Sequence, residues 1–257
     1  MSGRGGGAVV DPDTGGGGNT PAAGHVHPDM RTADGSRPLV VFDVLGTLVD
    51  QAGSMRRQTQ VATGWSERRA GDLVTEWLEH VAAQERRIVA GELSFSPSHD
   101  LDALALAHLV ADGTLPGGLS ARLADVPRRL DPWPDSVEGL ALLAEDMTVG
   151  GLSNASHPVL SALTRTSGMS WHLTLSAEDA RTYKPAPAVY QLALAAAPAG
   201  SPPPYLAAAH AWDLRAAASA GMRTAYVPRP GGDPPTSDDE FDVYADDLHH
   251  LHALLRA

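Results

Sequence analysis

Residues 38–48 read PLVVFDVLGTL, a short apolar run that ends in an aspartate and is followed by a Gly-Thr pair. A continuous apolar run rich in β-branched residues and bounded by turn-forming residues is typical of a strand buried on both faces of a parallel sheet. The stretch therefore predicts a central strand at residues 38–42, with Asp43 at its carboxyl end.

Similar runs follow at regular intervals along the chain. They occupy residues 147–152, 171–175, 205–209 and 223–227, with helical patterns at residues 158–166, 185–197 and 214–220 and a closing helix within residues 245–255. Alternation of strands and helices is typical of a parallel sheet covered on both faces. The sequence thus predicts an α/β protein with a Rossmann-like parallel sheet core.

One segment interrupts this alternation. Residues 52–130 carry apolar side chains at helical spacing and contain no convincing strand, which predicts an inserted helical cap. The segment PWP at residues 132–134 marks the return to the core, since proline disfavours helix at the preceding residue. The expected core therefore comprises residues 37–51 and 131–257.

The first 36 residues are dominated by glycine, proline and small polar residues. Such a segment cannot bury enough apolar surface to offset the entropy lost on ordering, so it is predicted to be a disordered tail. His25 and His27 are expected to be solvated side chains of that tail and not metal ligands.

Composition excludes several functional classes. The chain of 257 residues contains no cysteine, so disulfides, thiolate nucleophiles and cysteine-based metal sites are excluded. Its 31 acidic and 19 basic residues give a formal net charge of -12, which disfavours nucleic acid as a partner. No apolar stretch of about 18 residues is present to span a bilayer. We expect a cytoplasmic protein that acts on a small molecule, without a membrane partner.

Polar residues follow the predicted strands in a consistent way. In an open parallel sheet, ligands bind beyond the carboxyl ends of the strands. The residues that the sequence places at this edge are Asp43, Thr47, Ser153, Asn154, Lys184, His210 and Asp213. Each residue alone could be only a turn or cap residue, but their joint occurrence in this order predicts an active site.

The motifs resemble those of a known superfamily. The segment VFDVLGTL at residues 41–48, together with Ser153, Lys184 and Asp213, resembles the four motifs of the haloacid dehalogenase superfamily. The strings LSN at residues 152–154, YKPAPAVY at 183–190 and AWD at 211–213 are similar to the type II L-2-haloacid dehalogenase branch. The resemblance covers most of residues 38–255.

The resemblance implies a role for each motif residue. Asp43 would attack the substrate carbon and form an ester that water then cleaves, which divides one difficult step into two easier ones. Lys184 would keep Asp43 ionised, because a neighbouring positive charge favours the carboxylate. Asp213 would hold Lys184 or orient the hydrolytic water, and Thr47 would fix the nucleophile. Ser153 and Asn154 would donate hydrogen bonds to a substrate anion.

Other residues are expected at the substrate pocket. Leu45, Tyr190 and Trp212 are predicted to contact the substrate. His210 is either the general base for ester hydrolysis or a packed, hydrogen-bonded residue. The implied substrate is a small 2-haloalkanoic acid, no cofactor or metal is expected, and the relatives suggest a homodimer.

A magnesium-dependent phosphatase is the main alternative within the superfamily. Phosphatases carry a second aspartate two residues after the nucleophile, where this chain has Leu45, and a metal-binding acid where it has Ala209. Leucine cannot transfer a proton, and Mg²⁺ requires oxygen ligands. Displacement of a halide needs neither, so these residues favour dehalogenase chemistry.

The chain also departs from the dehalogenase pattern. Leu45 stands where that branch has tyrosine, His210 where it has asparagine, and Ala208 where it has serine. The branch uses a cap arginine to hold the substrate carboxylate, but alignment places Glu76 or Trp77 near that position. The alternative candidates are Arg56, Arg57 and Arg69.

Two further functions stay open at this stage. The same ester chemistry could open a strained ring or attack another electrophilic carbon. A binding module that retains the fold without catalysis is the alternative from another class, although retention of all the motif residues argues against it.

Overall fold

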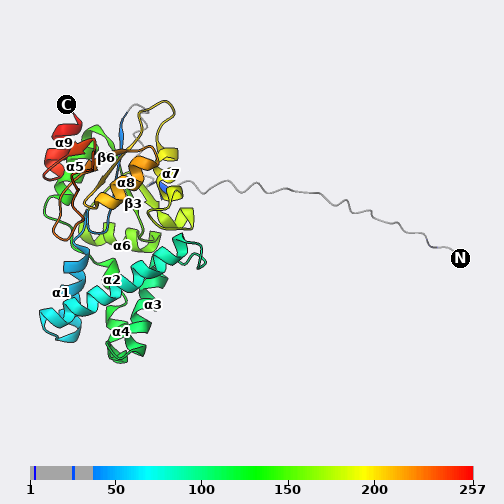
Figure 1. The fold of residues 1–257 in the computed structure, drawn as a ribbon, viewed down its shortest axis with the longest axis vertical. Helices are drawn as coiled ribbons and strands as arrows, with labels where there is room; N and C mark the ends of the chain where they lie inside the picture. The colour runs from blue at the N-terminus through cyan, green and yellow to red at the C-terminus, as the bar shows by residue number, and fades with distance from the viewer. Residues whose placement is uncertain (1–2, 4–24, 27–36, 257) are drawn as a thin grey trace.

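A computed structural model describes residue 3, residues 25–26 and residues 37–256 of the chain, and its centre is a seven-stranded sheet (Figure 1). The strands are β1 (His25–Val26), β2 (Leu39–Phe42), β3 (Thr148–Ser153), β4 (Leu173–Ser176), β5 (Tyr205–Ala208), β6 (Arg223–Tyr226) and β7 (Val243–Tyr244). Their order is β1-β4-β3-β2-β5-β6-β7, and all neighbouring pairs are parallel except β1 with β4. The predicted α/β class and the five predicted strands are confirmed.

The structure adds elements that the sequence did not predict. Strand β7 extends the sheet beyond β6. Helix α5 (Ser136–Asp146) precedes β3. Residues 25–26 were expected to be disordered, yet they pair antiparallel with β4 as β1. Apart from residue 3, the rest of the predicted disordered tail, including His27, lies outside the described residues, as does the side chain of His25.

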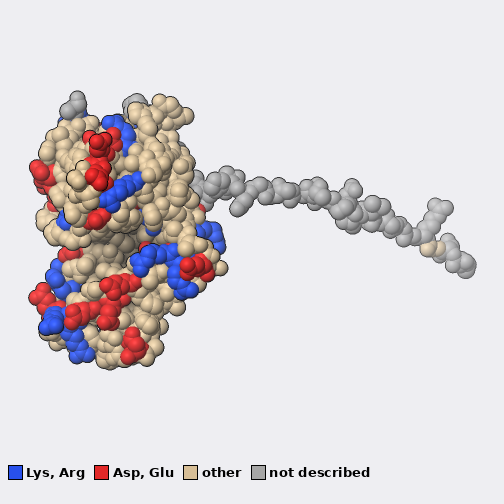
Figure 2. Space-filling model, viewed as in Figure 1, with Lys and Arg blue, Asp and Glu red and all other residues tan. Residues whose placement is uncertain are grey.

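The segment that was predicted to form a helical cap contains helices and no strand. We call α1 (Gln51–Thr63), α2 (Glu67–Val89), α3 (Ser98–Ala111) and α4 (Gly117–Leu123) the cap helices. A short 3-10 turn (Val126–Arg128) leads back to the core. Helix α2 packs against both α1 and α3, and the cap helices form one end of the molecule (Figure 1). Figure 2 shows that the surface is hollowed where this end meets the core.

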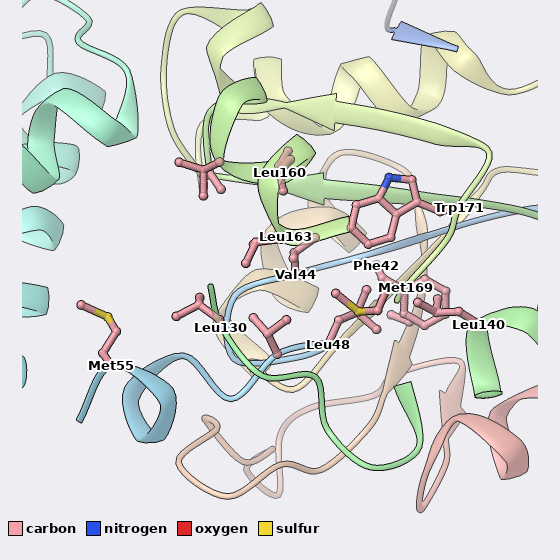
Figure 3. Packing of buried hydrophobic residues seen from close by; sticks show 14 of the residues in the cluster. Phe42, Val44, Leu48, Met55, Leu130, Leu140, Leu160, Leu163, Met169 and Trp171 are labelled. Atoms are coloured by element: carbon pink, nitrogen blue, oxygen red, sulfur yellow. The ribbon is translucent and has the colours of Figure 1, made fainter. Parts of the chain in front are cut away.

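The alternating side chains of β2 contribute to two separate clusters of buried residues. Val40 and Phe42 belong to the cluster that also contains residues of α5, α6 (His157–Ser167) and α9 (Leu248–Leu255), part of which is seen in Figure 3. Leu39 and Val41 belong to the second, with residues of α7 (Pro187–Ala196) and α8 (Ala211–Ser219). Because successive side chains of a strand point to opposite faces, helices cover the sheet on both sides. This burial fixes β2 and hence the position of Asp43.

Among the residues that the structure describes, no helix has the length and apolar character needed to cross a bilayer.

Candidate active site

The predicted site residues come from several loops at one edge of the sheet. Asp43 directly follows β2, Ser153 ends β3, and His210 precedes α8 after β5. Lys184 lies between β4 and α7, and Asp213 lies in the first turn of α8. Because β2, β3 and β5 are parallel neighbours, their carboxyl ends bring these side chains together.

The carboxylate of Asp43 receives a hydrogen bond on each oxygen. Thr47 Oγ1 donates to Oδ2 at 2.8 Å, and Lys184 Nζ donates to Oδ1 at 3.0 Å. The backbone N–H of Ala209 donates to Thr47 Oγ1 at 3.0 Å, which directs the threonine hydroxyl hydrogen toward Asp43. Asp43 is only 7% exposed, so its carboxylate is fixed in one orientation at the base of the site.

Lys184 joins Asp43 to a second buried acid. Its Nζ donates to Asp213 Oδ2 at 2.6 Å, and the hydroxyl of Tyr190 donates to the other Asp213 oxygen at 2.6 Å. Burial alone would lower the pKa of Lys184, but the carboxylates of Asp213 and Asp43 outweigh it and raise that pKa. Burial also raises the pKa of Tyr190, so its hydroxyl remains a donor. The arrangement places a permanent positive charge beside Asp43.

A cavity of about 250 Å³ opens above Asp43, between the core and the cap helices. Seven of the predicted site residues line it: Asp43, Leu45, Ser153, Asn154, Lys184, His210 and Trp212. Thr47, Asp213 and Tyr190 are fully buried and are not among its lining residues. Tyr190 was expected to contact the substrate, but the structure places it behind Lys184, against Asp213.

His210 and Trp212 form one side of this cavity. Their rings stack with centroids 6.0 Å apart, and Trp212 is 40% exposed. Leu45, the residue that occupies the place of the phosphatase acid, lines the same cavity. Leu45 therefore places an apolar side chain, which has no proton to transfer, where a phosphatase has its acid.

Comparison with known proteins gives a consistent result, although no protein-family model matches the chain. It is 30% identical over 205 residues to the (S)-2-haloacid dehalogenase 4A of Burkholderia cepacia, covering 76% of this chain and 84% of that relative. An (S)-2-haloacid dehalogenase of Pseudomonas fluorescens is 27% identical over 79% of this chain and 88% of its own length. The chain belongs to the type II haloacid dehalogenases. These proteins are hydrolases of the haloacid dehalogenase superfamily.

Solved structures agree with this membership. The L-2-haloacid dehalogenase PA0810 superposes with a TM-score of 0.76 at 29% identity, over 86% of this chain and 99% of its own. The Xanthobacter autotrophicus L-2-haloacid dehalogenase with chloropropionic acid covalently bound superposes with a TM-score of 0.71 over 86% of this chain and 99% of its own. At 22% sequence identity, this superposition shows a shared fold and nothing more.

The cap wall of this haloacid dehalogenase carries two acids that sequence reasoning missed. Glu85 of α2 and Asp102 of α3 both line the cavity. Burial raises the pKa of Glu85 to about 8 and that of Asp102 to about 7. A signal for Glu85 was present, because Leu78, Val81 and Glu85 recur at helical spacing and therefore share one face of α2.

Asn154 connects the core to this acidic wall. Its Nδ2 donates to Glu85 Oε2 at 3.0 Å, and its Oδ1 accepts from the backbone N–H of Lys184 at 2.9 Å. Asn154 was expected to donate to a substrate anion; one of its two amide N–H groups is directed to the cap, and the other is not donated to any described residue. Ser153 Oγ accepts from the backbone N–H of Ala155 at 3.1 Å, and its own hydrogen is not donated to any described residue.

The cap arginines considered for this dehalogenase do not reach the cavity. Arg56 pairs with Glu67 at 3.5 Å, and Arg57 donates to Asp50 and Asp131. The guanidinium of Arg69 lies 3.7 Å from the ring centroid of Trp65.

The aligned positions supply no cation either. Glu76 is exposed on α2, while Trp77 is buried and donates to Asp102 Oδ1 at 2.8 Å. Within the described part of the chain, no group of three or more His, Cys, Asp or Glu residues is placed to hold a metal ion.

Gly46 gives a direct test of how closely His210 approaches the nucleophile loop. Its φ is +86°, and a Cβ added there would lie 2.7 Å from His210 Nε2. Gly113 is a matched control, because its φ is +87° and nothing lies within 4 Å of its added Cβ. We expect Gly113→Ala to lower the free energy of unfolding by about 1–2 kcal/mol from backbone strain alone. Gly46→Ala should lower it further in urea denaturation, because His210 must also move. If both variants lose the same free energy of unfolding, the His210 side chain can move away from the added Cβ without destabilising the protein.

Proposed function

We propose that this protein is a hydrolytic dehalogenase that displaces halide from small 2-haloalkanoic acids, with Asp43 as the nucleophile. The observation that carries the proposal is the Asp43 carboxylate, which borders the cavity while Lys184 and Thr47 fix its two oxygens. The names of the relatives supply the substrate class.

In the first step, a carboxylate oxygen of Asp43 attacks the carbon that bears the halogen. The new C–O bond forms as the C–halogen bond breaks, and its electron pair leaves with the halide. The product of this step is an ester between Asp43 and the substrate. Lys184 holds its positive charge 3.0 Å from an oxygen of the attacking carboxylate; Asp213 accepts from Lys184 and, bonded in turn by Tyr190, holds it in place.

In the second step, water attacks the carbonyl carbon of the ester. The Asp43 C–O bond to the substrate breaks, the 2-hydroxy acid leaves, and one proton is released for each turnover. His210 is the basic side chain on the cavity wall that accepts the proton of this water in our proposal. Asp213 is a positioning residue, since both of its oxygens are bonded and it does not line the cavity.

Halide release in the presence of EDTA tests the proposed function. We expect the purified protein to release chloride from (S)-2-chloropropionate, and a chelator should leave the rate unchanged. The physical reason is that a departing halide needs neither a proton nor a metal ion. Chloride can be measured with an ion-selective electrode.

Two outcomes would contradict the proposal. Phosphate release from phosphomonoesters only with added Mg²⁺ would indicate a phosphatase despite Leu45. Inactivity in both assays would favour another electrophilic substrate or a binding role.

The proposal extends to the setting in which the protein works. The absence of cysteine supports a reducing cytoplasm, and the resemblance to other type II dehalogenases supports a homodimer. Light scattering on the purified protein should give about twice the chain mass of 26.8 kDa. A mass of one chain would remove the dimer from the proposal.

A further inference from the structure

The positive charge in the cavity that the proposed function uses is already shared between two acids. Lys184 is the only lysine or arginine among the described residues that line this cavity. Its Nζ donates to Asp43 at 3.0 Å and to Asp213 at 2.6 Å. An anion taken out of water needs charge or hydrogen-bond donors in return. A substrate carboxylate beside Asp43 therefore requires further donors on the lining.

Two unused donors lie together at the end of β3. The hydroxyl hydrogen of Ser153 and one amide N–H of Asn154 are not donated to any described residue. Both residues line the cavity together with Asp43. They can therefore meet the carboxylate of a substrate whose reacting carbon faces Asp43.

Glu85 of α2 joins this pair of donors from the cap side. Its Oε2 accepts from Asn154 Nδ2 at 3.0 Å, and its Oε1 has no hydrogen-bond partner among the residues that the structure describes. Because Oε2 already accepts, a proton on this carboxyl group belongs on Oε1, where it can be donated to a ligand in the cavity.

The surroundings of Glu85 favour its protonated form. Burial raises the pKa of Glu85 to about 8, and the negative charge of Asp102 adds to this effect. The hydrogen bond from Asn154 and the positive charges of Lys184 and Arg86 oppose it without reversing it. At pH 7 the carboxyl group is therefore mostly protonated and has an O–H to donate.

We propose that Glu85 binds the substrate as a neutral carboxylic acid, whose Oε1–H donates to the carboxylate of the 2-haloalkanoic acid beside Ser153 and Asn154. The inference rests on the proposed function for its substrate class. It gives Glu85 the task that the cap arginines were expected to perform, since none of them lines the cavity. A hydrogen bond to a charged acceptor is roughly twice as strong as one between neutral groups.

This role makes binding depend on pH in one direction. Once Glu85 loses its proton, it has no donor on Oε1, and its negative charge repels the substrate carboxylate. Binding is therefore strong below the pKa of Glu85 and weakens as pH rises through it.

Other titratable and charged groups surround Glu85 on both sides of the cavity. They are Arg86 of α2, Asp102 of α3, and Asp43, Tyr183, Lys184 and His210 of the core. Burial raises the pKa of Tyr183, and the carboxylates of Asp213 and Asp43 raise that of Lys184, so both keep their protons at mildly alkaline pH. A pH dependence that came from any of these groups would survive the replacement of Glu85.

Calorimetry of lactate binding tests the proposal without any chemical step. Lactate is the 2-hydroxy acid product of 2-chloropropionate, and it stays an anion throughout the range. We expect its Kd to be at least about ten-fold higher at about pH 9.5 than at pH 7. Near pH 9, titrations in buffers of different ionisation enthalpy should show about one proton taken up for each lactate bound. Circular dichroism at each pH checks that the fold persists.

Replacement of Glu85 separates its donor from its charge. Glu85→Gln can accept from Asn154 and donate through Nε2, but it cannot titrate. Its Kd at pH 7 should stay within about three-fold of the wild type and should not rise with pH. Glu85→Ala lacks the donor and should bind lactate about ten-fold more weakly at pH 7. Glu79→Gln is the matched control and should keep the wild-type profile, because Glu79 is an exposed glutamate of the same helix that does not line the cavity.

Asp102→Asn tests the neighbouring acid. Burial raises the pKa of Asp102 to about 7, so it ionises at a lower pH than Glu85 does. The variant removes a charge that raises the pKa of Glu85, so the loss of lactate binding should persist but move to lower pH.

The outcomes separate this inference from the proposed function. Lactate affinity that is the same at both pH values, or too weak to measure at pH 7, would overturn the inference even if halide is released. So would an alkaline loss that persists in Glu85→Gln, or a Glu85→Gln variant that no longer binds lactate. An alkaline loss that disappears in Glu85→Gln, in a protein that releases no halide, would overturn the proposed chemistry and leave the role of Glu85 in carboxylate binding standing.

Discussion

Asp43→Asn should abolish halide release, with kcat lowered at least about 1000-fold, because an amide oxygen cannot form the ester intermediate. Asparagine has nearly the same shape, and its single oxygen can accept from Lys184 while its Nδ2 donates to Thr47 Oγ1 in place of the bond that Thr47 donates to Asp43. The fold should therefore persist, which circular dichroism and urea denaturation can check. Asp72→Asn, on the exposed surface of α2, is the control and should retain full activity.

Isotope labelling separates attack by Asp43 from direct attack by water. In a single turnover in H₂¹⁸O, the oxygen that enters the product comes from the Asp43 carboxylate, and the label appears on Asp43. Mass spectrometry of the peptide that contains Asp43 measures this directly. Label in the first-turnover product, with none in the peptide, would contradict the ester mechanism even if Asp43→Asn is inactive.

The core half of the active site could be predicted because it depends on local sequence and on sheet geometry. A buried apolar run fixes β2, and Asp43 follows it directly. The carboxyl ends of parallel strands meet at one edge, so Ser153 and His210 were expected beside Asp43 once their strands were recognised. No long-range packing detail was needed for this step.

The cap half depends on how two layers of helices meet, which helical spacing alone does not determine. Spacing groups Glu85 with Leu78 and Val81 on one face of α2, but it does not show what that face opposes. Tyr190 illustrates the same limit in the core. Its motif was recognised, yet only the packing of α7 and α8 shows that its hydroxyl is directed to Asp213 and not to the cavity.

Short elements were missed for a different reason. Strands β1 and β7 have two residues each, too few for an alternating or continuous apolar pattern to be recognised. They are held by pairing with β4 and β6, which is a tertiary contact. Missing them did not affect the prediction of the site. Strands β1 and β7 are the two outermost strands of the sheet, whereas the active site lies at the carboxyl ends of its central strands.

Replacing Lys184 with methionine should impair both catalysis and stability. The substitution leaves Asp43 and Asp213 buried without their shared cation, and breaking such a pair costs about 3–5 kcal/mol. The pKa of Asp213, which burial already raises, should rise further, and the carboxylate of Asp43 loses the positive charge that lies 3.0 Å away. We expect kcat at pH 7 to fall at least about 100-fold. Urea denaturation and chloride release measure the two effects.

The pH dependence of this loss follows from the direction of the shifts. In the wild type the pKa of Lys184 is raised, so its contribution to stability is complete below the unfolded-state value of about 10.5 and is lost only as pH rises through the higher folded-state value. In Lys184→Met the pKa of Asp213 is raised above that of the unfolded chain, because burial raises it and Lys184 no longer lowers it. The variant should therefore be least stable above neutral pH and recover part of the loss as pH falls and Asp213 is protonated.

A double substitution distinguishes the electrostatic role of Lys184 from its packing. Lys184→Met combined with Asp213→Asn removes one of the two stranded charges, so it should be more stable than Lys184→Met alone. It should nevertheless remain inactive, because no positive charge is left beside Asp43. Recovery of activity together with stability would mean that Lys184 serves the fold only. Equal stability of the single and double variants at every pH would mean that the buried pair is held by packing and not by charge.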